Sequence, residues 1–248
     1  MNRIVLDTET ANNQFDDKGR NIKNTALVYD FGFAVVDEKE NTLEERSYVI
    51  KEIFFGMADV MQSAYYANKI PKYLNDIISG NRTVVSFWDA KKDFIALVNK
   101  YNVIDVMAHN AWFDFGALNT TMKYLSKSKY KYFFPKNMRI LDTMRMCREV
   151  LSNNADYINW CALNGFLDKR ELPRKTAEIV YRYISNNIDF VESHTGLEDV
   201  NIEKEIYFYC LKNQCSLINI LDKYKNDFVS TPLQKEIIKN IKYPKITP

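Results

Sequence analysis

The sequence predicts an α/β fold built from short strands and amphipathic helices. The first fifty residues contain apolar runs with the period-two alternation of β-strands, separated by polar turns. Later apolar runs are shorter, and each is followed by residues with helical spacing, which is typical of an α/β chain. With 248 residues, of which 46% are apolar and 14% aromatic, the chain can bury a substantial core, most simply as one domain with an appendage.

The first predicted strand runs through Ile4-Val5-Leu6 and ends in Asp7-Thr8-Glu9. Because successive side chains of a strand point to opposite faces, Asp7 and Glu9 share one face and lie close together. Two such carboxylates repel each other, and a bound Mg²⁺ or Mn²⁺ ion is the usual way to keep both ionised. A solvated strand end is the alternative explanation for an isolated pair, so the choice depends on residues further along the chain.

After the first strand, the sequence predicts two further strands and then a helical segment. The polar residues 12–24 predict a loop beside the acidic pair, and residues 26–36 and 44–50 predict two more strands, which form three antiparallel strands together with the first. Over residues 51–101 the spacing becomes helical, with Ser86 as the N-cap of the second helix. The Met and Tyr stripes of this segment predict core packing, and we expect no function from them.

A second acidic position follows the next apolar run, residues 103–108. This run leads into His109-Asn110-Ala111-Trp112-Phe113-Asp114, after which the spacing is helical. Asp114 is therefore expected in the first turn of a helix, where the helix dipole favours a carboxylate.

The segment between Asp114 and Asp142 contains no acidic residue, and its Lys and Arg residues alternate with Tyr and Phe. Basic side chains can contact phosphates while aromatic rings stack on unpaired bases, so this composition suits single-stranded nucleic acid. A solvated, lysine-rich loop with buried aromatic rings is the alternative.

The C-terminal half is expected to contain a strand end and a helix over 139–151, with Asp142 as the N-cap, and another helix over 177–184. Residues 153–173 give no assignable pattern.

The last predicted helix opens at Asp199 and extends to Tyr224. His194 precedes it in a loop that contains Gly196. A histidine is suited to taking a proton from water near neutral pH, so beside a metal-loaded acidic cluster His194 would act as a general base.

Three of these stretches together resemble the motifs of a known enzyme family. They are Asp7-Thr8-Glu9-Thr10, Asn110-Ala111-Trp112-Phe113-Asp114, and His194 followed by Asp199 at H-x4-D spacing. In this order they resemble the three motifs of the DnaQ-like, DEDDh 3′-5′ exonucleases. Each motif alone is weakly specific, but three in the right order and secondary-structure context are strongly specific. The sister DEDDy group would have Tyr at Y-x3-D spacing, where this chain has Thr195, so the histidine form is favoured.

The resemblance implies an RNase H-like fold, a five-stranded mixed sheet flanked by helices, with the first strand at its centre. It also implies two bound Mg²⁺ or Mn²⁺ ions, with His194 activating the attacking water and Asp7 bridging the ions. The metal-binding carboxylates would be those of Asp7, Glu9, Asp114 and Asp199. The residues around the terminal nucleotide would be Thr8, Thr10, Ala11, Asn110 and Phe113.

The expected activity is metal-dependent hydrolysis of phosphodiester bonds at the 3′ ends of single-stranded DNA, with release of nucleoside 5′-monophosphates. One alternative is an RNase T or oligoribonuclease-like enzyme that acts on RNA or short oligonucleotides. Another is a non-catalytic nucleic-acid or polymerase-binding subunit. The first motif continues as Ala11-Asn12, where many relatives have Thr-Gly, so the substrate preference can differ from that of a proofreader.

We expect the exonuclease domain over residues 1–226, with 51–101 as a helical segment inside it and 227–248 as a C-terminal tail. The sequence has no run of about 18 apolar residues, so no membrane span is predicted. The four cysteines show no metal-ligand spacing and are expected to be reduced thiols of a cytoplasmic protein. A polymerase or repair partner and a homodimer are left open.

Overall fold

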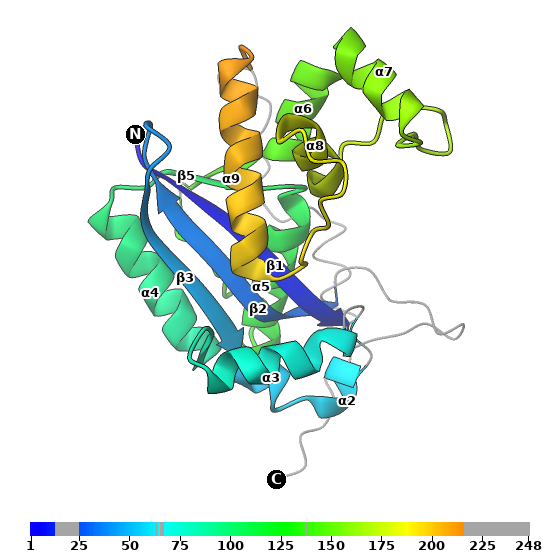
Figure 1. Cartoon of the computed structure of the whole chain (residues 1–248). Coiled ribbons are helices and arrows are strands. Elements are labelled where there is room, and N and C mark those ends of the chain that lie inside the picture. The colour runs from blue at the N-terminus through cyan, green and yellow to red at the C-terminus, as the bar shows by residue number, and fades with distance from the viewer. Residues whose placement is uncertain (13–24, 63, 65–66, 137, 216–248) are drawn as a thin grey trace.

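A six-stranded mixed sheet organises the part of the chain that the computed structural model describes, residues 1–12, 25–62, 64, 67–136 and 138–215 (Figure 1). The strands are β1 (Arg3–Asn12), β2 (Ala26–Val36), β3 (Thr42–Ile50), β4 (Thr83–Val85), β5 (Asp105–Ala108) and β6 (Arg139–Asp142). Their order across the sheet is β4-β3-β2-β1-β5-β6. Of the predicted loop 12–24, Asn12 is instead the last residue of β1, and residues 13–24 lie outside the described residues, as does the tail 227–248.

Strand β1 lies inside the sheet, antiparallel to β2 and parallel to β5. The pairs β3–β4 and β5–β6 are also parallel, whereas β2–β3 is antiparallel. The predicted α/β class with a mixed sheet is thus confirmed, but the expected five strands are one too few. The additional strand, β4, has three residues and lies between two helices, so it is too short to show a period-two pattern.

Helices cover both faces of this sheet (Figure 1). They are α1 (Lys51–Phe54), α2 (Ala58–Gln62), the 3-10 helix η1 (Ala67–Lys69), α3 (Ile70–Ile78), α4 (Phe87–Lys100), α5 (Trp112–Ser126), α6 (Thr143–Leu151), α7 (Ala155–Leu163), α8 (Ala177–Ile184) and α9 (Gly196–Lys212). None of these described helices combines the length and apolar character that a bilayer span requires. The predicted N-caps are confirmed, because the Ser86 and Asp142 side chains accept hydrogen bonds from the first turns of α4 and α6.

Three details differ from the sequence prediction. The helical segment 51–101 is divided into several helices, from the three-residue η1 to the 14-residue α4, with β4 among them. Helix α7 lies in the stretch 153–173 that had no assignable pattern, because the exposed Ile158 and Leu163 blur its apolar stripe. Helix α9 begins at Gly196, so Asp199 lies in its first turn and does not open it, and the helix ends at Lys212, before the predicted end at Tyr224.

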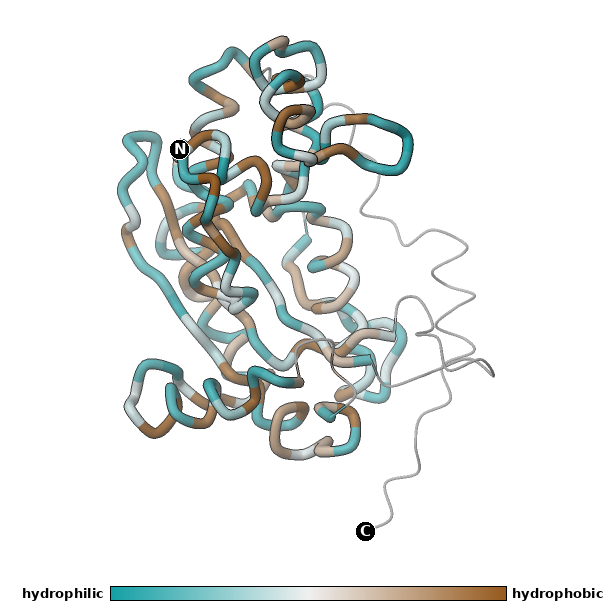
Figure 2. The backbone as a smooth tube through the Cα atoms, turned by 45° about the vertical axis from the view of Figure 1, so that its right-hand side comes forward, coloured by the Kyte–Doolittle hydropathy of each residue, from teal (hydrophilic) through white to brown (hydrophobic). Residues whose placement is uncertain are grey.

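Alternating side chains of β1 pack into two separate hydrophobic cores, one on each face of the sheet. Ile4 and Leu6 pack on one face of the sheet with residues of α4 and α5, while Val5 packs on the other face with α6, α8 and α9. Figure 2 shows that hydrophobic residues concentrate along the central strands and that the turns between them are hydrophilic. By the same alternation, Asp7 and Glu9 point to the face that α9 covers.

The first turn of α9 is held unusually close to β2. A Cβ atom added to Gly32 would lie 2.2 Å from the carbonyl carbon of Gly196, so this approach requires glycine. The backbone N–H of Gly196 also donates a 2.9 Å hydrogen bond to the buried carboxylate of Asp30. Because Gly32 pairs with Asp7 in the sheet, these contacts place the start of α9 beside the acidic end of β1.

Candidate active site

Strand β1 and helix α5 join through Thr8, the residue between the two acids of the first motif. Asp114, in the first turn of α5, accepts hydrogen bonds from the backbone N–H of Thr8 at 3.1 Å and from its hydroxyl at 2.7 Å. The carboxylate of Asp114 is therefore fixed directly beside Asp7 and Glu9.

Helix α9 and the loop before it bring the third motif to the same place. Ligand atoms of Glu9, His194 and Asp199 all lie within 4.8 Å of one another. Asp199 is 3% exposed, whereas the side chain of His194 is 31% exposed. His194 adopts a left-handed backbone conformation, with φ of 50°, immediately before the N-cap residue of α9. The imidazole thus lies at the solvent side of a buried acidic cluster.

A fifth carboxyl group, that of Glu203, also faces this cluster. It is 3% exposed, lies one helical turn after Asp199 on α9, and accepts a hydrogen bond from the backbone N–H of His109. Glu203 was not among the site residues that the sequence predicted. An acid four residues after Asp199, next to the apolar position Ile202, was the available signal.

Several carboxylate oxygens of the cluster are buried without a hydrogen-bond partner. Among the described residues, these include Asp7 Oδ2, Asp199 Oδ1 and Glu203 Oε2. Buried oxygens normally have a partner, and an unpaired one costs on the order of 1–3 kcal/mol. Converging carboxylate oxygens of this kind are the ligands that hard divalent cations prefer. The residues therefore fit Mg²⁺ or Mn²⁺.

The pKa values of these acids are all raised, with burial as the largest cause. The pKa of Asp7 and that of Glu203 are raised well above the usual range by burial, with the neighbouring carboxylates adding to the effect. Burial and nearby acids raise the pKa of Glu9 to about 9 and that of Asp199 to about 8. The pKa of Asp114 rises to about 7, although hydrogen bonds from the strand oppose the rise. A divalent cation would favour the ionised forms again.

The residues predicted around the terminal nucleotide fall into two groups. The backbone N–H and hydroxyl of Thr8 both donate to Asp114, and Ala11 is buried in the core at 1% exposure. Thr10 is partly exposed, while Asn110 and Phe113 are exposed, Phe113 by 48%. Phe113 therefore has an open aromatic ring two positions after the core residue Ala111 and next to Asp114.

The second histidine has a structural role. His109 Nδ1 lies 3.0 Å from the Thr143 hydroxyl, and Nε2 lies 2.7 Å from the Lys175 carbonyl oxygen. Burial lowers the pKa of this imidazole. Both ring nitrogens thus contribute to packing α6 and the segment before α8 against the end of β5.

The basic and aromatic segment after α5 is only partly available for contacts with nucleic acid. Phe133 and Phe134 lie in the core, and the ring of Phe134 stacks on Phe115 with centroids 4.1 Å apart. Tyr130 and Tyr132 are exposed by 78% and 43%. The alternative of buried aromatic rings therefore holds for the two phenylalanines.

Comparisons with known proteins give a consistent result for the fold. No protein-family model matches this chain, and no curated protein matches it. Among solved structures, the nuclease domain of 3′hExo, a DEDDh family member bound to rAMP, is similar over 86% of this chain and 93% of its own, with 12% identity and a TM-score of 0.56.

Exonuclease I provides further similar structures. The E. coli enzyme in complex with a dA16 oligonucleotide is similar over 90% of this chain, with 13% identity and a TM-score of 0.52, and this similarity covers 42% of the exonuclease I chain. Exonuclease I from Methylocaldum szegediense is similar over 88% of this chain and 42% of its own, with 13% identity and a TM-score of 0.52. This chain thus corresponds to less than half of exonuclease I.

The sheet, its flanking helices and these similarities define the architecture as an RNase H-like α/β fold. More narrowly, the chain has the fold of the DEDDh exonucleases, as its three short motifs predicted.

Proposed function

We propose that this protein is a metal-dependent 3′-5′ exonuclease that acts on single-stranded DNA and releases nucleoside 5′-monophosphates. The observation that carries this proposal is the convergence of the four predicted acids from β1, α5 and α9, with His194 beside them. A binding module has no need to bury mutually repelling carboxylates with unpaired oxygens.

The residues of the three motifs have distinct roles in this reaction. Asp7, Glu9, Asp114 and Asp199 would hold two divalent ions, which when bound supply charge stabilisation for the attacking and leaving oxygens of the phosphodiester. His194 would accept the proton of the attacking water, since its imidazole is partly exposed and partial burial lowers its pKa, which keeps it neutral and able to accept near pH 7. The exposed ring of Phe113 would stack on the base of the terminal nucleotide.

DNA is favoured because exonuclease I structures contain single-stranded DNA, as in the E. coli ExoI-ssDNA complex with a TM-score of 0.54. The 3′hExo structure contains rAMP, and this observation supports the second candidate, an RNase T or oligoribonuclease-like activity on RNA ends.

The test uses 5′-labelled single-stranded DNA and RNA of equal sequence, each incubated with the protein and Mn²⁺. We expect a ladder that shortens from the 3′ end of DNA, with nucleoside 5′-monophosphates as the products. Faster shortening of RNA would select the second candidate. If neither polymer is shortened, the proposal is wrong.

The matched variants for this test are Asp7→Asn and Asp59→Asn. Loss of one buried acid at the metal site should reduce turnover by about 10³ or more, equivalent to roughly 4 kcal/mol. Asp59 is exposed on α2, so its variant should behave as wild type. A non-catalytic binding subunit would keep its affinity for nucleic acid in both variants and show no turnover in wild type.

A further inference from the structure

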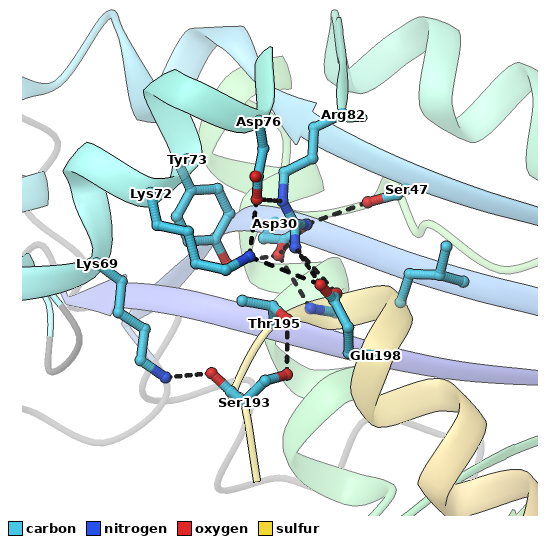
Figure 3. Close-up of polar contacts among 12 residues, drawn as sticks. Asp30, Ser47, Lys69, Lys72, Tyr73, Asp76, Arg82, Ser193, Thr195 and Glu198 are labelled. Carbon is cyan, nitrogen blue, oxygen red and sulfur yellow. Dashed lines mark hydrogen bonds and ion pairs between the residues drawn. The ribbon is translucent and has the colours of Figure 1, made fainter. Parts of the chain in front are cut away.

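The helical segment between β3 and α4, for which the sequence predicted no function, reaches the candidate active site. Lys69, the last residue of η1, donates a hydrogen bond from Nζ to the backbone carbonyl of Ser193, the residue before His194 (Figure 3). The hydroxyl groups of Ser193 and Thr195 lie 2.8 Å apart on either side of His194. The Lys69 ammonium is therefore fixed beside the loop that carries the imidazole.

A buried guanidinium fastens this segment to the sheet and to α9. Arg82 is 3% exposed in its side chain and pairs with Asp30 at 3.0 Å, with Asp76 at 3.2 Å and with Glu198 at 2.9 Å (Figure 3). The hydroxyl of Tyr73 donates to the same Asp30 carboxylate at 2.5 Å. These contacts join α3, β2 and the first turn of α9, so the position of Lys69 relative to His194 is set by folded elements on both sides.

The surroundings of Lys69 are acidic. Burial lowers the pKa of this ammonium, and the charges of Glu9, Asp199 and Glu192 oppose that effect. Lys69 in turn helps to lower the pKa of His194, after burial. Both effects place the ammonium within electrostatic range of the acids that converge from β1 and α9.

We propose that Lys69 is a substrate-contacting residue whose ammonium binds a non-bridging oxygen of the phosphate next to the scissile bond. An ammonium has three N–H donors, so the contact with Ser193 is compatible with a second contact to phosphate. The inference rests on the proposed exonuclease function and adds a phosphate contact from a segment outside the three motifs. Its competitor is a purely structural role in holding the Ser193 carbonyl.

The two roles are separated by the salt dependence of binding. Each phosphate contact by a cation makes log Kd for single-stranded nucleic acid change with log salt by about 0.7, because counterions are released. We would measure Kd for a 5′-labelled dT oligonucleotide in chelator over a series of NaCl concentrations, and kcat and KM with Mn²⁺. The proteins are wild type, Lys69→Met, Lys69→Arg and Lys212→Ala.

For Lys69→Met we expect binding on the order of tenfold weaker at low salt and a slope smaller by about 0.7, with both largely restored in Lys69→Arg. Lys212 is the control for net charge, since it pairs with exposed Glu40 at the far end of α9, about 25 Å from the first turn. Lys212→Ala should match wild type. Thermal melting of each variant shows whether it is folded.

A Lys69→Met protein with the wild-type slope and Kd would overturn the inference, even if its kcat fell, because that result is expected of a structural role. This outcome leaves the proposed function intact as long as wild type shortens DNA or RNA. Wild type that neither shortens nor binds nucleic acid would reject both.

Discussion

The acids and the histidine of the candidate site differ in exposure, and this difference suggests different roles. Asp199 and Glu203 are almost fully buried with unpaired oxygens, whereas His194 is partly open to solvent. However, ligand atoms of His194, Glu9 and Asp199 all lie within 4.8 Å of one another, and His194 Nδ1 is 3.7 Å from Glu192. This position fits two roles, a general base and a metal ligand, and we propose that the imidazole serves as the base.

His194→Gln distinguishes these two roles. A general base contributes about 10² to 10⁴ to the rate, so turnover should fall by that factor while the affinity and stoichiometry of Mn²⁺ remain those of wild type. Turnover is measured on labelled single-stranded DNA, and metal binding is measured by calorimetry. Weaker Mn²⁺ binding in His194→Gln would identify the imidazole as a ligand and contradict its assignment as the base.

At the scale of elements, the site depends on how closely α9 approaches β2. The first turn of α9 carries Asp199, and the glycine pair Gly32 and Gly196 sets its distance from the sheet. Asp30 adds a hydrogen bond to the same turn. Because Asp7 lies opposite Gly32, a shift of α9 would separate the acids of the third and first motifs.

Gly32→Ala tests this dependence. The added Cβ would clash with α9 backbone, which cannot be relieved by a side-chain rotation, so we expect a loss of at least about 1–3 kcal/mol in the free energy of unfolding and a loss of activity. Chemical denaturation followed by circular dichroism measures the first effect.

The matched control is Gly116→Ala on α5, where an added Cβ has no heavy atom within 4 Å. Alanine in a helix is favoured over glycine by about 0.5–1 kcal/mol, so this variant should be as stable as wild type or more so. A Gly32→Ala protein that unfolds at the wild-type denaturant concentration would show that α9 can move away at little cost.

The sequence predicted those parts of the site that local patterns determine. Period-two alternation places Asp7 and Glu9 on one face, and a first-turn position accounts for Asp114. The approach of Lys69 depends instead on contacts between distant elements, which no local pattern encodes. Residues 51–101 show the same limit, because their apolar stripes indicated core packing but not which neighbour the polar side chains would meet.

In the folded molecule, burial and mutual repulsion make the ionised forms of the site acids unfavourable. The free energy of unfolding should therefore depend on pH. In the unfolded chain the carboxyl groups lose their protons near pH 4, whereas in the folded chain Asp114, Asp199 and Glu9 hold theirs up to about 7, 8 and 9. Stability from these groups is therefore complete below about pH 4 and is lost as the pH rises through 7 to 9.

A divalent cation should remove this loss, because it binds the ionised carboxylates and lowers their pKa values in the folded state. We therefore expect the difference in Tm between protein with excess Mg²⁺ and protein in chelator to increase from pH 6 to pH 9. A change of one pKa unit is worth about 1.4 kcal/mol, which corresponds to several degrees in Tm for a chain of this size. The partly buried His109 titrates in the opposite sense, but it affects both samples equally and cancels in the difference. In Glu9→Gln, which removes the group with a pKa of about 9, the increase should be smaller. A Tm difference that stays constant or shrinks as the pH rises would show that these acids do not bind the cation.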